Sequence, residues 1–124
     1  MSNNRLSFCT FTPQSDNVTE VKFDEDILVD IDMVDQYHHW LNTHHNSDFG
    51  VLIDKTDHYS YTFEAQLKIG RIDKMKAASF LVKDHSAELA IESLMGIKQR
   101  RKIDYEIFYD HTLALAWLEN KLSH

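Results

Sequence analysis

The stretch Phe49-Gly50-Val51-Leu52-Ile53-Asp54 is a short, continuous apolar run that ends at a carboxylate. Such a run is typical of a strand inside a parallel sheet, because both faces are covered and neither requires polar side chains. Two further runs with β-forming character follow along the chain, Ala77 to Val82 and Ile103 to Tyr109. Together they predict three strands of one sheet.

The segments that follow these strands have apolar residues at helical spacing. We expect helices from about Ser60 to Ile72, from Ser86 to Ile97 and from His111 to Leu122. Phe63 and Leu67 should face the sheet from the first of these helices. The inward residues of the last should be Leu113, Ala116, Trp117 and Leu118. Strands that alternate with helices of about a dozen residues imply crossover connections and a largely parallel sheet.

The N-terminal part has a different pattern. Leu6 to Phe11 and Val18 to Phe23 are rich in β-forming residues, which predicts an antiparallel hairpin at the edge of the sheet. Asp30 stands where a helix N-cap is expected. The helix after it should bury one stripe, formed by Met33, Val34, Tyr37, Trp40 and Leu41. The predicted fold class is therefore α/β, with a mixed, mostly parallel sheet, an N-terminal antiparallel hairpin and about four helices.

Length and composition fit one domain over residues 1–124. The single cysteine, Cys9, excludes an internal disulfide and a zinc site built from several thiolates. The N-terminus lacks the features of a signal peptide, and no apolar run is long enough to span a membrane, so we expect a soluble cytoplasmic protein.

Charge is unevenly distributed along the chain. Residues 1–62 hold 11 of the 20 acidic residues but only 3 of the 13 basic residues. A net charge of −7 disfavours nucleic acid as a partner, because binding to nucleic acid depends on clustered Lys and Arg. Four of the cations lie together between Lys98 and Lys102, in a predicted loop. A solvated turn is the default interpretation, and contact with anionic lipid or self-association as a homodimer is the alternative.

Signatures of common enzymes are missing from the sequence. It contains no G-x-S-x-G elbow, no G-x-G-x-x-G and no P-loop, so we predict neither catalysis nor a bound cofactor. The pairs His38-His39 and His44-His45 leave a surface metal site open, since imidazole is a common metal ligand. Without accompanying carboxylate ligands, a structural or surface role is the alternative that we favour.

The segment from Asp54 to Thr62 lies just after the predicted central strand and leads into a helix. Open α/β sheets place ligands and switches at this position. We expect Ser60 to cap the helix, with its hydroxyl accepting a bond from a free backbone N–H. A phosphate added to Ser60 would bring nearly two negative charges. An ordinary cap without modification is the alternative.

Three segments resemble the STAS/SpoIIAA-like group, which is related to anti-sigma-factor antagonists and overlaps in fold with Sec14-type lipid-binding domains. They are residues 49–54, residues 76–82, and Tyr105 to Phe108 with the following Ala114-Leu115-Ala116-Trp117-Leu118. The resemblance extends over residues 6–122 and implies a non-enzymatic domain that regulates a partner protein. It also implies that Asp54 is similar to the strand-end aspartate of these antagonists, and that Ser60 is similar to their phosphorylated hydroxyl. The Gly of the family's Asp-Ser-Ser-Gly turn is absent here.

Two functional hypotheses follow. In the first, Asp54, Ser60 and Thr62 belong to a surface that binds a protein partner, and phosphorylation of Ser60 or Thr62 repels an acidic face of that partner. In the second, the aromatic residues Tyr59, Tyr61, Phe63 and Phe80 surround an apolar pocket for a lipid-like ligand, with ordinary core packing as the alternative.

Overall fold

The structure is a computed structural model that describes residues 4–96 and 103–123. Its strands are β1 (Arg5–Leu6), β2 (Cys9–Ser15), β3 (Val18–Phe23), β4 (Leu28–Val29), β5 (Phe49–Asp54), β6 (Ser60–Tyr61), β7 (Met75–Leu81) and β8 (Asp104–Phe108). Its helices are α1 (Ile31–His44), α2 (Phe63–Lys68), α3 (His85–Met95) and α4 (His111–Leu122).

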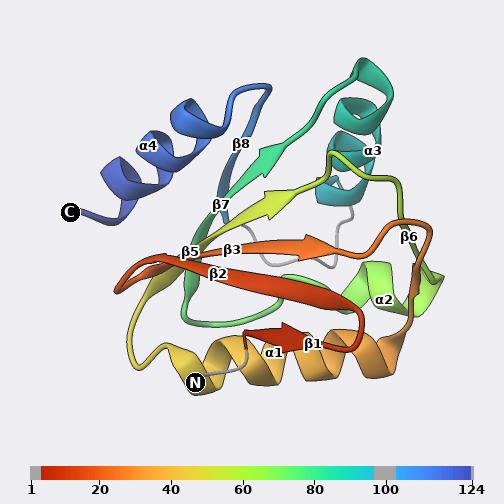
Figure 1. The fold of residues 1–124 in the computed structure, drawn as a ribbon, viewed down its shortest axis with the longest axis horizontal. Coiled ribbons are helices and arrows are strands. Elements are labelled where there is room, and N and C mark those ends of the chain that lie inside the picture. The colour runs from red at the N-terminus through yellow and green to blue at the C-terminus, as the bar shows by residue number, and fades with distance from the viewer. Residues whose placement is uncertain (1–3, 97–102, 124) are drawn as a thin grey trace.

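Six strands form the main sheet in the order β1-β2-β3-β5-β7-β8 (Figure 1). The β1, β2 and β3 strands pair antiparallel, whereas β3, β5, β7 and β8 are parallel neighbours. This arrangement confirms the predicted mostly parallel sheet with an N-terminal hairpin at its edge. A second sheet, formed by β4 and β6, was not predicted, because its two-residue strands carry no detectable sequence pattern.

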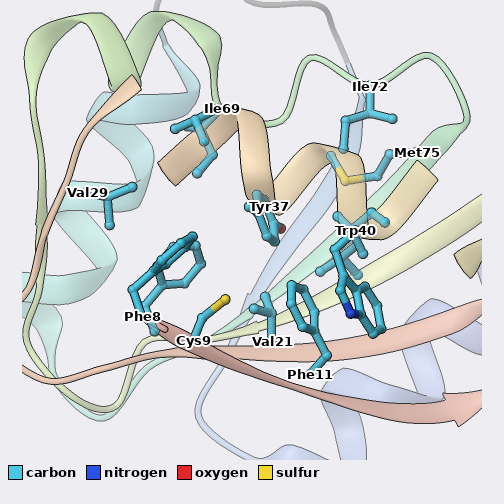
Figure 2. Close-up of a cluster of buried hydrophobic side chains, with 14 of the residues drawn as sticks. Phe8, Cys9, Phe11, Val21, Val29, Tyr37, Trp40, Ile69, Ile72 and Met75 are labelled. Carbon is cyan, nitrogen blue, oxygen red and sulfur yellow. The ribbon is translucent and has the colours of Figure 1, made fainter. Parts of the chain in front are cut away.

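One face of the sheet is covered by α1 and α2 around an aromatic core. The Phe11 and Trp40 rings stack with centroids 3.8 Å apart, and Tyr37 packs edge-on to Phe23 with centroids 5.3 Å apart. Figure 2 shows Phe11, Tyr37 and Trp40 gathered between the hairpin and α1, with Cys9 beside them. As expected, Asp30 is the N-cap of α1, and its carboxylate accepts a hydrogen bond from the backbone N–H of Met33 at 2.9 Å.

The opposite face is covered by α4, which packs on β5, β7 and β8 (Figure 1). Ala114 and Leu118 are the buried residues of α4, which confirms the inward orientation of Leu118. Leu113 is 60% exposed and Ala116 is also exposed, so the prediction that these two residues face the sheet is wrong. Gly50 allows the close approach of this helix. A Cβ at this position would lie 2.8 Å from Leu122 Cδ1 and 2.9 Å from Leu118 Cδ2.

The second helix is shorter than predicted and begins later. Thr62, not Ser60, is its N-cap, and the Thr62 hydroxyl accepts a hydrogen bond from the N–H of Ala65 at 3.2 Å. The helix ends before Gly70, whose φ of 83° lies in the left-handed region. With this start, Ala65 faces the core and Phe63 is 71% exposed, so the predicted inward orientation of Phe63 is also wrong.

Of the four histidines in the pairs His38-His39 and His44-His45, His38 and His45 are buried, and each makes a hydrogen bond to a different part of the chain. His38 Nε2 accepts a hydrogen bond from the N–H of Gly70 at 3.2 Å, whereas His45 Nε2 lies 2.8 Å from the Thr19 hydroxyl. His44 stacks on Trp40 and its Nδ1 lies 2.8 Å from the Trp40 carbonyl oxygen. Among residues 4–96 and 103–123, no three His, Cys, Asp or Glu side chains are grouped so that they could hold a metal ion.

Candidate functional site

A groove of about 450 Å³ lies between the loop after β5 and helix α3. The loop, residues 55–61, begins at the carboxyl end of β5, and α3 follows the carboxyl end of the neighbouring parallel strand β7. Adjacent parallel strands end at the same edge of a sheet, so the two walls of the groove meet there. This edge is where open α/β sheets bind their ligands.

Asp54 shapes the loop from its base. Its Oδ1 accepts two hydrogen bonds from Thr56, one from the backbone N–H at 2.9 Å and one from the hydroxyl at 2.6 Å. Lys22 Nζ lies 3.9 Å from Asp54 Oδ2 and 3.4 Å from Asp57 Oδ2. Asp54 does not line the groove. Its carboxylate instead closes the turn after β5 and helps to hold the loop in place.

The loop wall of the groove combines one cation with two tyrosines. Lys55 Nζ lies 3.9 Å from the centre of the Tyr59 ring and 5.0 Å from that of Tyr61. The two tyrosine hydroxyls are 3.3 Å apart. Burial, and then the neighbouring Tyr61, raise the pKa of Tyr59 well above its usual value, so that Tyr59 stays neutral at physiological pH.

The other wall is formed by one side of α3. Small residues dominate it, so the helix leaves open space above its backbone: Ser86, Ala87, Ala90 and Ser93, with Ile91 and Leu94. Ile91 is the only buried residue of this helix. Asp84 begins the helix and its carboxylate accepts a hydrogen bond from the N–H of Ala87 at 2.9 Å.

A separate apolar cavity lies beneath the groove, deeper in the core. Tyr61 and Phe80 belong to its lining, together with Tyr37, Met75 and Leu94. Its volume of about 30 Å³ is room for a single water molecule. Known sites for small organic ligands measure about 300 Å³ or more.

The predicted site residues divide into three groups, and Phe63, which lines neither the groove nor the cavity, belongs to none of them. Tyr59, Ser60 and Tyr61 line the groove, and Tyr61 with Phe80 lines the cavity below it. Asp54 and Thr62 make local hydrogen bonds that shape the turn and cap α2.

Sequence reasoning missed the α3 wall completely. Its signal was available in the sequence, because Ser86, Ala87, Ala90 and Ser93 place small residues along one side of a helix that follows a central strand.

Two further features bear on possible partners. The basic segment from Lys98 to Lys102 lies outside the described residues, so its predicted contacts stay predictions. Among the helices that the structure describes, none is both long and apolar enough to cross a membrane.

Comparison with known proteins supports the fold. No protein-family model and no curated protein sequence matches this chain. A solved structure does: an uncharacterized protein of the DUF3478 family from Shewanella loihica PV-4, described as having a SpoIIAA-like fold. The two are 18% identical in sequence, with a TM-score of 0.63, and the match covers 95% of this chain and 98% of the other. The expected resemblance is therefore confirmed in three dimensions: the chain has a SpoIIAA-like fold.

Proposed function

We propose that this domain is a non-enzymatic regulatory module of the cytoplasm that binds a segment of a partner protein in the groove between residues 55–61 and α3. The observation that carries the proposal is the groove itself, about 450 Å³ in volume and open at the carboxyl edge of the parallel strands. The tyrosine rings of its loop wall and the small residues of its α3 wall offer apolar contact area, and its hydroxyl groups offer hydrogen bonds.

Ser60 is the residue best placed to regulate such binding. It is exposed and lines the groove, whereas the Thr62 hydroxyl is occupied in capping α2. The backbone N–H of Ser60 donates to the Ile27 carbonyl at 3.0 Å, which fixes the position of the residue. A phosphate on Ser60 would place nearly two negative charges in the groove and repel an acidic partner segment.

A lipid-like ligand is the second candidate, and the apolar cavity beside Tyr61 and Phe80 favours it. At about 30 Å³ this cavity holds no acyl chain unless α3 moves outward. Little packing opposes such movement, because α3 buries Ile91 alone. Mass spectrometry of the protein purified from its own host would detect a retained acyl species.

The test of partner binding is affinity purification from the host with matched variants. Ala90→Arg fills the groove from an exposed helix position, and Ala116→Arg makes the same substitution at an exposed position of α4. We expect a protein to co-purify in stoichiometric amount with the wild type and Ala116→Arg but not with Ala90→Arg. Equal recovery with both variants would contradict the proposal.

A further inference from the structure

The three cations of the acidic N-terminal half have different surroundings. Arg5 Nη2 lies 2.6 Å from Asp24 Oδ2, and Lys22 lies within ion-pair distance of Asp54 and Asp57. Lys55 forms no ion pair with any carboxylate in the part of the chain that the structure describes. It is the cation of the three that faces the groove.

The position of Lys55 is fixed even without a carboxylate. Its ammonium group lies over the Tyr59 and Tyr61 rings at distances typical of cation–π contacts, and its backbone N–H donates to the Leu81 carbonyl at 2.8 Å. The side chain is half-buried, so part of its hydration is already lost. A partly desolvated cation held in one place loses little further entropy or hydration when an anion binds to it.

The surrounding groove groups are suited to the same ligand. The hydroxyls of Ser60, Ser86 and Ser93 make no side-chain hydrogen bond within residues 4–96 and 103–123, and each can donate to an oxygen atom. Asp57, the carboxylate that lines the groove, is paired with Lys22. Lys55 and Asp57 are the formally charged residues that line the groove, so their charges balance, and of the two Lys55 is the one without an ion pair among the described residues.

From this arrangement we infer that the partner segment is acidic: a peptide that places an Asp or Glu carboxylate against Lys55 and an adjacent apolar side chain along the Ala87 and Ala90 face of α3. The inference rests on the proposed function and specifies its ligand. Lys55 supplies the charge that selects the segment, and the small residues of α3 leave room for its apolar neighbour.

Lys121 offers a matched control for Lys55. Its ammonium group also lies near an aromatic ring, 5.6 Å from the centre of Trp117, but it lies 3.8 Å from Asp104 Oδ2 and belongs to α4 on the opposite face. Lys55→Gln and Lys121→Gln thus remove the same charge from beside an aromatic ring, on opposite faces of the sheet, and only Lys121 has a carboxylate partner among the described residues.

The probe is a phage-displayed library of random dodecapeptides, selected in parallel on the wild type, Lys55→Gln, Lys55→Glu, Lys121→Gln and Ala90→Arg. Wild type and Lys121→Gln should enrich peptides with an acidic residue next to an apolar one, whereas Lys55→Glu should enrich basic peptides. For a peptide selected on the wild type, Lys55→Gln should raise Kd by about tenfold.

Acidic enrichment that persists on Lys55→Glu would overturn the inference, as would selection on the wild type that yields no more acidic peptides than the unselected library contains. Peptides that require an open groove at Ala90 but are indifferent to Lys55 would reject the acidic ligand and leave the groove as a docking site. Failure of the proposed function is detected separately, in the affinity purification, by equal recovery of the host partner with Ala90→Arg and with Ala116→Arg.

Discussion

Helices α1 and α3 pack on the same face of the sheet, yet they are anchored very differently. In α1, Val34, Tyr37, His38, Trp40 and Leu41 are buried, whereas α3 buries Ile91 alone. Ile53 of the central strand packs against both the buried cluster that contains the α1 residues and the cluster that contains Ile91. The difference indicates that the α1 side mainly stabilises the fold, whereas the α3 side exposes small and polar residues that line the groove.

The largest expected effect comes from the core under α1. Phe11 is 1% exposed and stacks on Trp40, so Phe11→Ala should lower the free energy of unfolding by about 3–5 kcal/mol. Ile91→Ala in α3 should cost about 2 kcal/mol, at the lower end for a buried aliphatic residue. Urea denaturation of both variants measures the difference. A larger loss for Ile91→Ala would invert the comparison.

Acid should lower the stability of the fold through His45, the C-cap residue of α1. Burial lowers the pKa of His45 from its ordinary 6.5, and nearby His44 and Lys74 act in the same direction. Because the unfolded chain then binds the proton more readily, the contribution of His45 is complete above pH 6.5 and is lost as pH falls below it.

The measurement is urea denaturation at about pH 7.5 and about pH 5.5, on the wild type and on His45→Gln. The wild type should lose more stability between the two conditions than the variant. The same loss in both proteins would remove His45 from the explanation.

Thiol reactivity should separate the two sides without changing stability much. Burial raises the pKa of Cys9 to about 12, so almost no thiolate forms at neutral pH. Ser93 is exposed in the groove, and the variant Ser93→Cys should react readily with a thiol reagent while Cys9 reacts only after unfolding. Rapid labelling of Cys9 in the native wild type would show that the core under α1 opens easily.

The smallest stability effect is expected at the groove. Ala90 is exposed, and Arg has nearly the same helix propensity as Ala, so Ala90→Arg should change the free energy of unfolding by less than about 0.5 kcal/mol. Ala116→Arg should behave alike. A loss like that of Ile91→Ala would mean that α3 is packed as firmly as α1.

Local patterns predicted the elements well where neighbours in sequence determine the structure. The apolar run of β5 and the Asp30 cap both depend on adjacent residues, and both are confirmed. The helical pattern after Ser60 predicts that this residue is the helix cap, but a contact with a residue far away in the sequence determines its position. Its pairing with Leu28 makes it part of a strand and leaves the cap to Thr62.

Only one of the two walls of the groove could be predicted from the sequence, because only that wall is determined by neighbouring residues. The loop wall follows from the position of residues 54–62 after a central strand. The α3 wall comes from residues about 30 positions further along the chain, which the pairing of β5 with β7 brings alongside the loop. Phe63 and Leu113 illustrate a different kind of wrong prediction. Both are apolar residues in helices and are therefore predicted to be buried, but the helices begin or face differently from the prediction and leave both side chains exposed.

Photo-crosslinking in host cells offers a direct readout of where the partner binds. A photoreactive amino acid would replace Ser93 in the groove, Ala116 on α4 or Thr12 on the hairpin, three exposed positions. We predict a discrete crosslinked product from the Ser93 position, absent from the other two and abolished when Ala90→Arg is added. Crosslinks from Ala116 or Thr12 with none from Ser93 would contradict the assignment of the groove as the binding site.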